Sequence, residues 1–175
     1  MRIGVVSDTH LPQFGRALPR ALVDGLRDAA VERVLHLGDH TEPDVPALFE
    51  AIAPFDAVAG NNDGEALLAR YGRSKIVILD GVRIGMTHGD LGAGRTTPER
   101  AAGAFSPDAV EVVLFGHSHV PRLERLEDGR WLLNPGSPTA RRQQPRFSWA
   151  FLEVVRVGGV AEVRGELRFY DDRSI

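Results

Sequence analysis

The first half of the chain alternates short apolar segments with segments of helical periodicity, and this alternation constrains the fold more than any other feature. The apolar segments span residues 2–7, 31–37 and 55–59, and the helical segments span residues 18–30, 43–53 and 65–70. Strands that alternate with helices predict a largely parallel sheet that is covered by helices on both faces.

The second half changes to a pattern with hairpins. Asp80-Gly81 is a strong two-residue turn signal between the apolar segments 75–79 and 82–87. A helix is expected at residues 98–104, and further strands at residues 110–115, 122–126, 130–133, 148–156 and 161–170. The summed pattern predicts an α/β fold, a four-layer αββα sandwich of two mixed β-sheets flanked by helices. No linker or repeat interrupts the 175 residues, so we expect one domain over residues 1–175.

Five of the predicted strands end in a carboxylate, an amide or an imidazole. Side chains at i and i+2 of an extended strand point to the same side, so Asp8 and His10 should leave the first strand together. In open α/β sheets, ligands bind outside the carboxyl ends of the strands. The residues collected at these ends are Asp8, His10, Asp39, Asn61, His88, His117 and His119.

This set of side chains favours a site for divalent transition metals. It offers carboxylate oxygens, one amide oxygen and four imidazoles, and the chain has no cysteine. Imidazole with carboxylate suits Mn, Fe, Zn or Ni better than Mg or Ca. Seven ligands are too many for one tetrahedral centre but suit two metals that share a bridging carboxylate. Such a site would be cationic and would attract an anion, although the net charge of the chain is −3.

The same residues carry a resemblance to a known family. The motifs Asp8-x-His10, Gly38-Asp39, Gly60-Asn61, His88-Gly89 and Gly116-His117-x-His119 occur in this order. They resemble the five motifs of the calcineurin-like metallophosphoesterases. The chain length and the motif Asn134-Pro135-Gly136-Ser137 are most similar to the small bacterial and archaeal phosphodiesterase branch.

The resemblance implies a metal-dependent phosphoric ester hydrolase, and above all a phosphodiesterase. It implies two divalent metal ions per chain. Manganese is the expected metal, and iron, zinc and nickel are the alternatives. The implied ligands of one ion are Asp8, His10, Asp39 and His119, and those of the other are Asp39, Asn61, His88 and His117. Asp39 would bridge the two ions, and a metal-bridging hydroxide would attack phosphorus in line.

The chain departs from the family pattern at Asn62, where many members carry a histidine that can protonate the leaving oxygen or stabilise the transition state. An amide can donate a hydrogen bond but cannot act as a general acid near neutral pH. We therefore assign Asn62 and Asp39 as the catalytic residues, and expect phosphodiesters or activated leaving groups to be preferred over ordinary monoesters.

Residues beside the motifs are candidates for substrate contact, each with a plainer alternative. Asn62 is one candidate. His40 either lines the mouth of the pocket or lies in a solvated loop, and Ser137 belongs either to a loop near the metals or to a simple turn. Arg141 either grips a phosphate from a loop folded over the site or is solvated. Asp63 is expected to cap the helix at residues 65–70, with a role as a ligand as the alternative.

Two other residues near the motifs carry expectations of their own. His36, inside the strand at residues 31–37, is expected in the core. Asp90 either orients His88 or caps a turn, and the sequence does not separate these alternatives.

The alternative function is a catalytically weak or inactive scaffold for protein interaction, the role ascribed to the eukaryotic retromer subunit that shares the resembled fold. The complete set of metal ligands favours the enzyme. The acidic net charge and the lack of a basic, aromatic tract argue against nucleic acid. No apolar run approaches the roughly 18 residues of a membrane span, so a cytoplasmic protein acting on a small-molecule phosphate ester is expected. The C-terminal edge strands leave a homodimer open.

Overall fold

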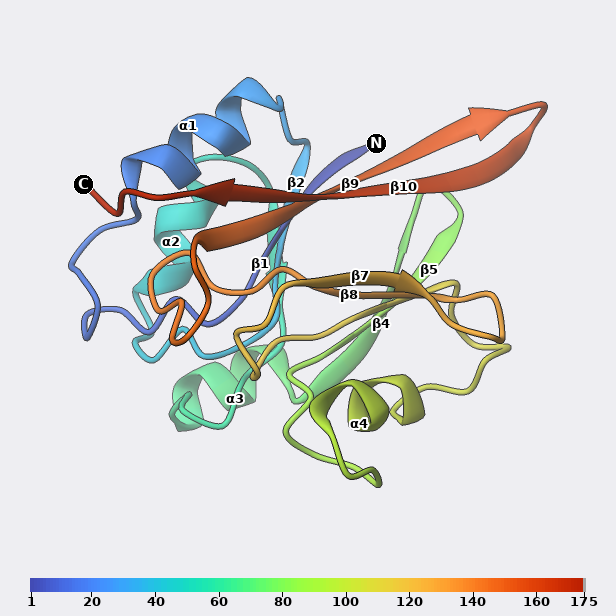
Figure 1. Cartoon of the computed structure of the whole chain (residues 1–175), viewed down its shortest axis with the longest axis horizontal. Coiled ribbons are helices and arrows are strands. Elements are labelled where there is room, and N and C mark those ends of the chain that lie inside the picture. The colour runs from blue at the N-terminus through green and yellow to red at the C-terminus, as the bar shows by residue number, and fades with distance from the viewer. Residues whose placement is uncertain (175) are drawn as a thin grey trace.

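The computed structural model describes residues 1–174 and arranges their strands in two five-stranded sheets (Figure 1). The first sheet has the order β10-β9-β1-β2-β3, and the second has the order β4-β5-β6-β8-β7. The strands are β1 (Arg2–Val6), β2 (Arg33–His36), β3 (Phe55–Ala57), β4 (Ser74–Leu79), β5 (Val82–Thr87), β6 (Val112–Leu114), β7 (Arg122–Arg125), β8 (Trp131–Asn134), β9 (Phe147–Val157) and β10 (Val160–Tyr170). The helices are α1 (Arg20–Asp28), α2 (Val45–Glu50), α3 (Glu65–Tyr71) and α4 (Thr97–Gly103).

Both sheets contain parallel and antiparallel pairs, as predicted. In the first sheet, β1, β2 and β3 run parallel, while β9 is antiparallel to β1 and to β10. In the second sheet, β5, β6 and β8 run parallel, with β4 and β7 antiparallel at the edges. The carboxyl ends of the parallel strands therefore lie at one edge of each sheet.

The two sheets pack face to face and are covered by helices on their outer faces (Figure 1). The inner faces bury a shared core that includes Ile3, Leu35 and Ile84. Leu22 of α1 and Phe49 of α2 are completely buried against the outer face of the first sheet. Each such side chain contributes about 1.5–3 kcal/mol when it is removed from water. Ala101 of α4 packs with Phe115 and Leu132 on the outer face of the second sheet. The predicted αββα sandwich is confirmed.

Each helix and strand of the structure overlaps a segment predicted from the sequence, and the predicted and observed elements differ in where they begin and end. The helix predicted at residues 18–30 spans only Arg20–Asp28, because Pro19 occupies the N-cap and Ala30 adopts a positive φ of 47°. Asp80 and Gly81 form the expected hairpin turn, with φ of 50° and 87°. Within residues 1–174, no helix combines the length and the apolar character needed to cross a lipid bilayer.

Candidate metal centre

The loops that follow β1, β2, β5 and β6 are joined to one another at the carboxyl ends of the strands. The backbone N–H of Gly116 donates to the carbonyl of His88 at 3.0 Å, which ties the loop after β6 to the loop after β5. The backbone N–H of Asp8 donates to the carbonyl of Gly38 at 3.0 Å, which ties the loop after β1 to the loop after β2. The backbone N–H of His117 donates to Oδ2 of Asp8 at 3.0 Å, which ties the first sheet to the second. The polar strand ends are thereby brought into one cluster.

Unusual backbone conformations turn the functional side chains inward. Five of the predicted ligands have a left-handed φ between 45° and 66°, a region that costs non-glycine residues free energy and is enriched at ligand clamps. They are Asp8, His10, Asp39, His117 and His119. Asp8 and His10 do come together, but not through the extended geometry that the sequence suggested. Close approach also explains one glycine, since a Cβ on Gly60 would collide with the carboxylate of Asp39.

The first group of potential ligands is Asp8, His10 and His119, and all three are buried. Nε2 of His119 lies 3.3 Å from Oδ1 of Asp8, and Nε2 of His10 lies 3.8 Å from the same oxygen. The two Nε2 atoms are 3.3 Å apart. These donor atoms face one another closely enough to bind a single ion.

The second group is Asp8, Asp39 and His88, with Asn61 and His117 beside it. Nε2 of His88 lies 3.4 Å from Oδ2 of Asp39. Oδ1 of Asn61 lies 3.1 Å from Nε2 of His88 and 3.0 Å from Nδ1 of His117. Oδ2 of Asp39 is also 3.5 Å from Nε2 of His10, so this carboxylate stands between the two groups.

The chemistry of these atoms fits divalent cations. Oδ1 of Asp8 is buried and has no hydrogen-bond partner among the described residues, a costly arrangement unless a cation satisfies it. Nδ1 of His88 donates to the carbonyl of Leu37 at 2.7 Å, and Nδ1 of His119 donates to the carbonyl of Ala140. These bonds orient the rings so that each Nε2 faces the cluster and, once deprotonated, can present its lone pair to a metal, as in histidines that bind metals.

The ionisable groups prepare a negatively charged site. Burial opposes ionisation of Asp8, but the adjacent imidazoles of His10 and His119 outweigh it and hold the pKa of Asp8 well below the usual value. Burial likewise opposes ionisation of Asp39, and the hydrogen bond from His88 lowers its pKa. Burial disfavours the charged form of His88, yet its hydrogen bond to Asp39 raises its pKa to about 9. Below that pH a cation must displace a proton from His88.

Metal affinity is therefore expected to rise with pH. Between about pH 7 and pH 9, each unit should increase the association constant by up to about tenfold, because one proton leaves His88 when the ion binds. Calorimetric titration of metal-free protein in buffers of different ionisation enthalpy measures both the affinity and the released proton. A His88→Asn variant should bind more weakly and lose most of this pH dependence. Affinity independent of pH in the unchanged protein would contradict the proton displacement.

Asn62 lies beside the carboxylate of Asp39. Its side-chain amide donates to Oδ2 of Asp39 at 2.7 Å, and its backbone N–H donates to Oδ1 at 2.9 Å. Asn62 is exposed, so its amide also borders solvent. This position allows contact with a substrate at the two metal groups, and the catalytic role of Asn62 stays a prediction.

His40 does not line a pocket mouth or a solvated loop, and both expectations are wrong. Its side chain is completely buried, and its ring stacks on His36 at 3.9 Å and on Tyr71 at 5.7 Å between centroids. Nδ1 of His40 bonds to Oδ2 of Asp63 at 3.0 Å. The positive φ of Asp39 turns the chain so that His40 enters the core. His36 lies in the core, as expected, at 0% exposure.

Ser137 hydrogen-bonds to the backbone of the loop that carries Asp8 and does not face a substrate. It is buried, and its hydroxyl donates to the carbonyl of Asp8 at 2.7 Å while accepting from the backbone N–H of Ala140 at 2.8 Å. Asn134 of the same motif donates to the carbonyl of Gly116 at 2.7 Å. The motif is thus a buried clamp on two loops that carry predicted ligands. The alternative of a loop near these ligands is confirmed, and the expected substrate contact by Ser137 is wrong.

Arg141 lies on an exposed loop beside the centre. Its guanidinium donates to the carbonyls of Gln144 and Pro145 and lies 5.5 Å from the ring of Phe147. A small cavity of about 220 Å³ separates this loop from the segment after His117, with Ser118 in its wall. A phosphate contact by Arg141 stays a prediction.

Asp63 is a structural residue that the sequence misassigned. The N-cap of α3 is Gly64, so the expected cap is wrong. The Asp63 carboxylate instead accepts from the backbone N–H groups of Asp39 at 2.9 Å, Gly60 at 2.8 Å and Thr41 at 2.7 Å. It thereby joins the loops after β2 and β3, which carry Asp39 and Asn61. The sequence offers no signal for this pattern, because the acceptor and donors are more than twenty residues apart in two of the three bonds.

Asp90 neither orients His88 nor caps a turn. Its carboxylate forms an ion pair with Arg73, which also donates to the carbonyl of Gly60. This pair ties the loop after β5 to the loop after β3 and thus braces the second metal group from outside.

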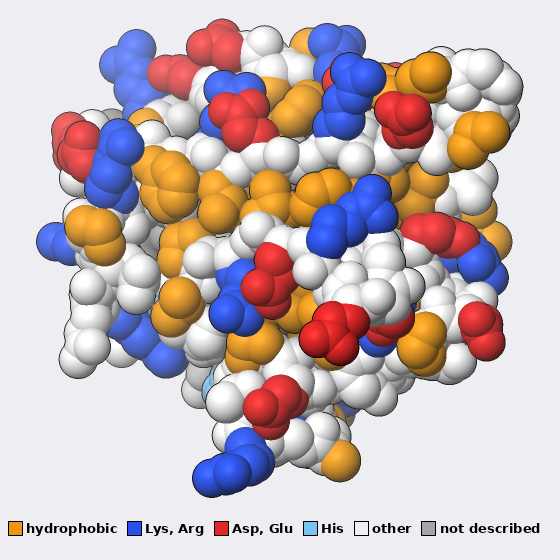
Figure 2. Space-filling view, turned by 45° about the vertical axis from the view of Figure 1, so that its right-hand side comes forward, with side chains coloured by type: hydrophobic (Ala, Val, Ile, Leu, Met, Phe, Trp, Pro, Cys, Tyr) orange, Lys and Arg blue, Asp and Glu red, His pale blue; other side chains and the backbone are white. Residues whose placement is uncertain are grey.

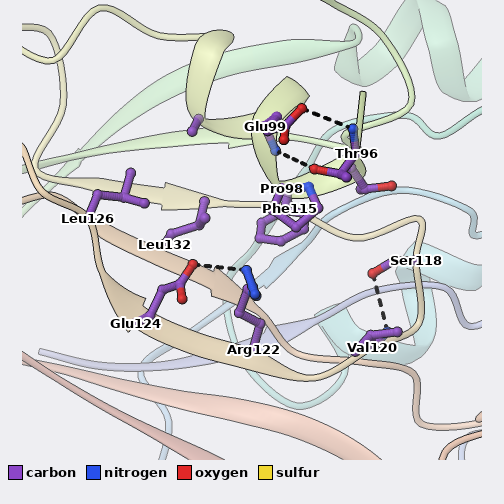
Figure 3. Close-up of a pocket in the computed structure, with 12 residues that line it drawn as sticks. Thr96, Pro98, Glu99, Phe115, Ser118, Val120, Arg122, Glu124, Leu126 and Leu132 are labelled. Carbon is purple, nitrogen blue, oxygen red and sulfur yellow. Dashed lines mark hydrogen bonds and ion pairs between the residues drawn. The ribbon is translucent and has the colours of Figure 1, made fainter. Parts of the chain in front are cut away.

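A wider cavity of about 600 Å³ lies between α4 and β7 on the outer face of the second sheet (Figure 3). Phe115 and Leu132 form an apolar part of the cavity wall. Polar side chains elsewhere in the wall pair with one another. Arg122 bonds to Glu124 at 3.0 Å, and Thr96 and Glu99 form the capping box of α4. None of the seven predicted ligands lines this cavity, so the metal groups remain the candidate site.

Comparison with known proteins agrees with this geometry. Residues 1–156 match the sequence profile of the calcineurin-like phosphoesterase superfamily domain. A protein named probable metallophosphoesterase from Methanothermobacter thermautotrophicus is 38% identical over 164 residues, covering 91% of this chain and 87% of the relative. A solved structure described as a novel archaeal phosphodiesterase has a TM-score of 0.67 and 27% identity, over 96% of this chain and 100% of that chain. Vps29 from Chaetomium thermophilum has a TM-score of 0.76 over 98% of this chain and 97% of that chain, and its 20% identity shows a shared fold alone.

Proposed function

The chain belongs to the calcineurin-like phosphoesterase superfamily, and we propose on that premise that it hydrolyses phosphodiesters with two divalent cations held at the strand ends. The observation that carries the proposal is that two adjoining groups of carboxylate and imidazole donors share Asp8, whose buried Oδ1 has no hydrogen-bond partner among the described residues. A fold kept only for protein contacts would not need every one of these ligands.

In this proposal, each cation has its own ligands and the two share Asp39. One ion would be held by Asp8, His10, Asp39 and His119, and the other by Asp39, Asn61, His88 and His117. The position of Asp39 supports the shared role, since its Oδ2 is 3.5 Å from Nε2 of His10 and 3.4 Å from Nε2 of His88. Manganese is the proposed metal, because imidazole with carboxylate suits it and its neighbours in the first transition row.

A pair of divalent cations in this cage would polarise a phosphoryl oxygen and lower the pKa of a bound water. The protein supplies the positioning. Asp39 is held by Asn62 from one side and by the backbone clamp of Asp63 from the other, so its carboxylate is fixed before substrate arrives. An amide has two N–H donors, and that of Asn62 uses one on Asp39, so the second can donate to a phosphoryl oxygen.

No proton donor for a leaving oxygen stands at position 62, and this sets the expected substrate preference. The protein loaded with manganese should turn over an aryl phosphodiester faster than an alkyl phosphomonoester, by about 10²–10⁴-fold, the usual effect of general acid catalysis. An Asn62→His variant should narrow this difference by improving the alkyl ester. Steady-state kinetics with both substrates measure it. Equal turnover of the two substrates by the unchanged protein would contradict the assignment.

The proposed activity is tested by turnover of an aryl phosphodiester before chelation, after chelation and after return of manganese. Turnover that disappears with the metal and returns with it is the expected result. Two bound cations without turnover of any phosphate ester would instead favour the alternative role as an interaction scaffold. The proposed substrate is a small molecule and the proposed location is the cytoplasm, both on the composition of the sequence.

A further inference from the structure

One long edge strand of the first sheet is open. β10 (Val160–Tyr170) pairs with β9 on one side, and among residues 1–174 no strand pairs with its other side. An edge of eleven residues presents a row of backbone donors and acceptors that can pair with another chain. Proteins that avoid such pairing shorten, bend, cover or charge their edges. β10 runs its full length beside β9 without interruption, and its charges alternate in sign, so they repel a second copy only in some registers.

The register of the sheet shows which residues of β10 offer their backbone. The backbone N–H of Val154 donates to the carbonyl of Met1 at 2.8 Å. Every second residue of β9, counted from Val154, therefore directs its backbone N–H and C=O groups toward β1. The intervening residues of β9 direct their backbone groups toward β10, where Glu153 lies opposite Arg164 and Phe151 lies opposite Glu166. The even-numbered residues of β10 therefore bond to β9. Ala161, Val163, Gly165 and Leu167 turn their N–H and C=O groups outward.

The charged side chains on the outer face of β10 alternate in sign. In chain order they are Glu162, Arg164, Glu166 and Arg168, and each is about half exposed. This order is self-complementary. If a second copy runs antiparallel with Gly165 opposite Gly165, then Glu162 faces Arg168 and Arg164 faces Glu166 across the junction. These are the pairs without backbone hydrogen bonds, in which opposite side chains come closest.

Charge also selects this register over its neighbours. The outward backbone groups belong to odd-numbered residues, so they stay opposite one another only if the partner strand slides by two residues at a time. The smallest shift in one direction sets Arg164 opposite Arg164 and Glu162 opposite Glu166, and in the other direction it sets Glu166 opposite Glu166 and Arg164 opposite Arg168. Like charges directly opposite one another are destabilising. The register centred on Gly165 also pairs all eleven residues of β10.

An apolar band accompanies the open edge. Figure 2 shows a continuous band of hydrophobic side chains across this face, between β10 and the β7–β8 pair, with charged side chains of both signs above it. Val163 and Leu167 of β10 and Leu123 of β7 are partly buried against the core between the sheets. In the register centred on Gly165, Val163 of one copy meets Leu167 of the other and extends this core across the junction.

We propose that two copies of this chain pair antiparallel along β10, with a two-fold axis at Gly165, into one continuous ten-stranded sheet. The backbone pairs Val163–Leu167 and Gly165–Gly165 each exchange two hydrogen bonds. The four charge pairs on the outer face and the apolar pairs on the inner face fix the register. The pairing is independent of the proposed phosphoester hydrolysis, because it uses no residue of the metal groups.

Charge-block variants test the pairing without touching the core. Glu162→Arg with Glu166→Arg makes all four outer charges positive, and Arg164→Glu with Arg168→Glu makes all four negative. Each variant alone should sediment with the mass of one chain, whereas the unchanged protein should sediment with the mass of two. An equimolar mixture of the two variants should restore the mass of two chains, because unlike charges then face each other at every pair. Sedimentation equilibrium measures these masses.

A full charge swap is the matched control. Glu162→Arg, Arg164→Glu, Glu166→Arg and Arg168→Glu together reverse every charge but keep the order self-complementary, so this variant should remain a dimer. Thermal unfolding of each variant checks that the fold persists. The proposal is overturned if the unchanged protein is monomeric up to its solubility limit, if either charge-block variant stays dimeric alone, or if the mixture of folded variants fails to associate.

Discussion

Replacing Asp39 with alanine is expected to remove both cations and to lower kcat/KM for an aryl phosphodiester by roughly 10³-fold or more. The reason is its position between the two ligand groups, 3.5 Å from Nε2 of His10 and 3.4 Å from Nε2 of His88. One substitution then takes a negatively charged ligand from each ion. Several kcal/mol of charge stabilisation depend on the metals, and every 1.4 kcal/mol corresponds to a factor of ten in rate.

The measurement combines metal content by mass spectrometry with steady-state kinetics. Asp24→Ala is the matched control, because Asp24 is an exposed carboxylate on α1 that pairs with Arg20 and lies outside both ligand groups. This control should retain two ions and unchanged turnover. An Asp39→Ala protein that keeps both ions, or that turns over substrate at the unchanged rate, would exclude a shared ligand at this position.

Replacing Asp63 with alanine is expected to reduce the free energy of unfolding by about 3–6 kcal/mol. The carboxylate accepts three backbone N–H bonds and one from His40, and its side chain is completely buried. A buried donor left without an acceptor costs about 1–3 kcal/mol. Because folded proteins are stable by only about 5–15 kcal/mol, this loss is a large part of the total.

Urea denaturation of metal-free protein measures the loss without interference from metal binding. Asp44→Ala is the control in the same region, since Asp44 is exposed and its side chain makes no capping bond to α2. It should change stability by no more than about 0.5 kcal/mol. A free energy of unfolding for Asp63→Ala within that margin of the unchanged protein would show that the clamp carries no stability.

The same clamp should make stability depend on acid. Burial opposes ionisation of Asp63, but the hydrogen bond from His40 outweighs it and lowers its pKa. A carboxylate with a lowered pKa contributes stability that is complete above its unfolded value and disappears as the pH falls below about 4. The unchanged protein should therefore lose more stability between about pH 5 and pH 2 than the Asp63→Ala variant. Parallel slopes of stability against pH would contradict this contribution.

The sequence predicted the strands and the polar residues at their ends well enough to bring the ligands together. Apolar segments that end in a polar residue mark the carboxyl ends of strands, and parallel strands gather those ends at one edge. Asp8, Asp39 and His88 meet for this reason. The sequence did not predict the directions in which individual side chains of the loops point. His40 was expected near solvent and enters the core, because the positive φ of Asp39 reverses the local path.

The misassigned polar residues share a physical cause. Asp63 and Ser137 satisfy backbone groups of loops distant in sequence, and such partners have no local signature. The short-range rules suggested a helix cap for the first and a turn or substrate contact for the second. The metal ligation, the roles of Asn62 and Arg141 and the single-domain organisation stay predictions.

The most direct test of the two-cation centre is anomalous diffraction at the manganese edge from crystals grown with manganese. Two anomalous peaks about 3.5–4 Å apart are expected, with Asp39 in contact with both. Asp8, His10 and His119 should surround one peak, and Asn61, His88 and His117 the other. A single peak in the cage, or two peaks that Asp39 does not join, would contradict the dinuclear centre from which the proposed hydrolysis follows.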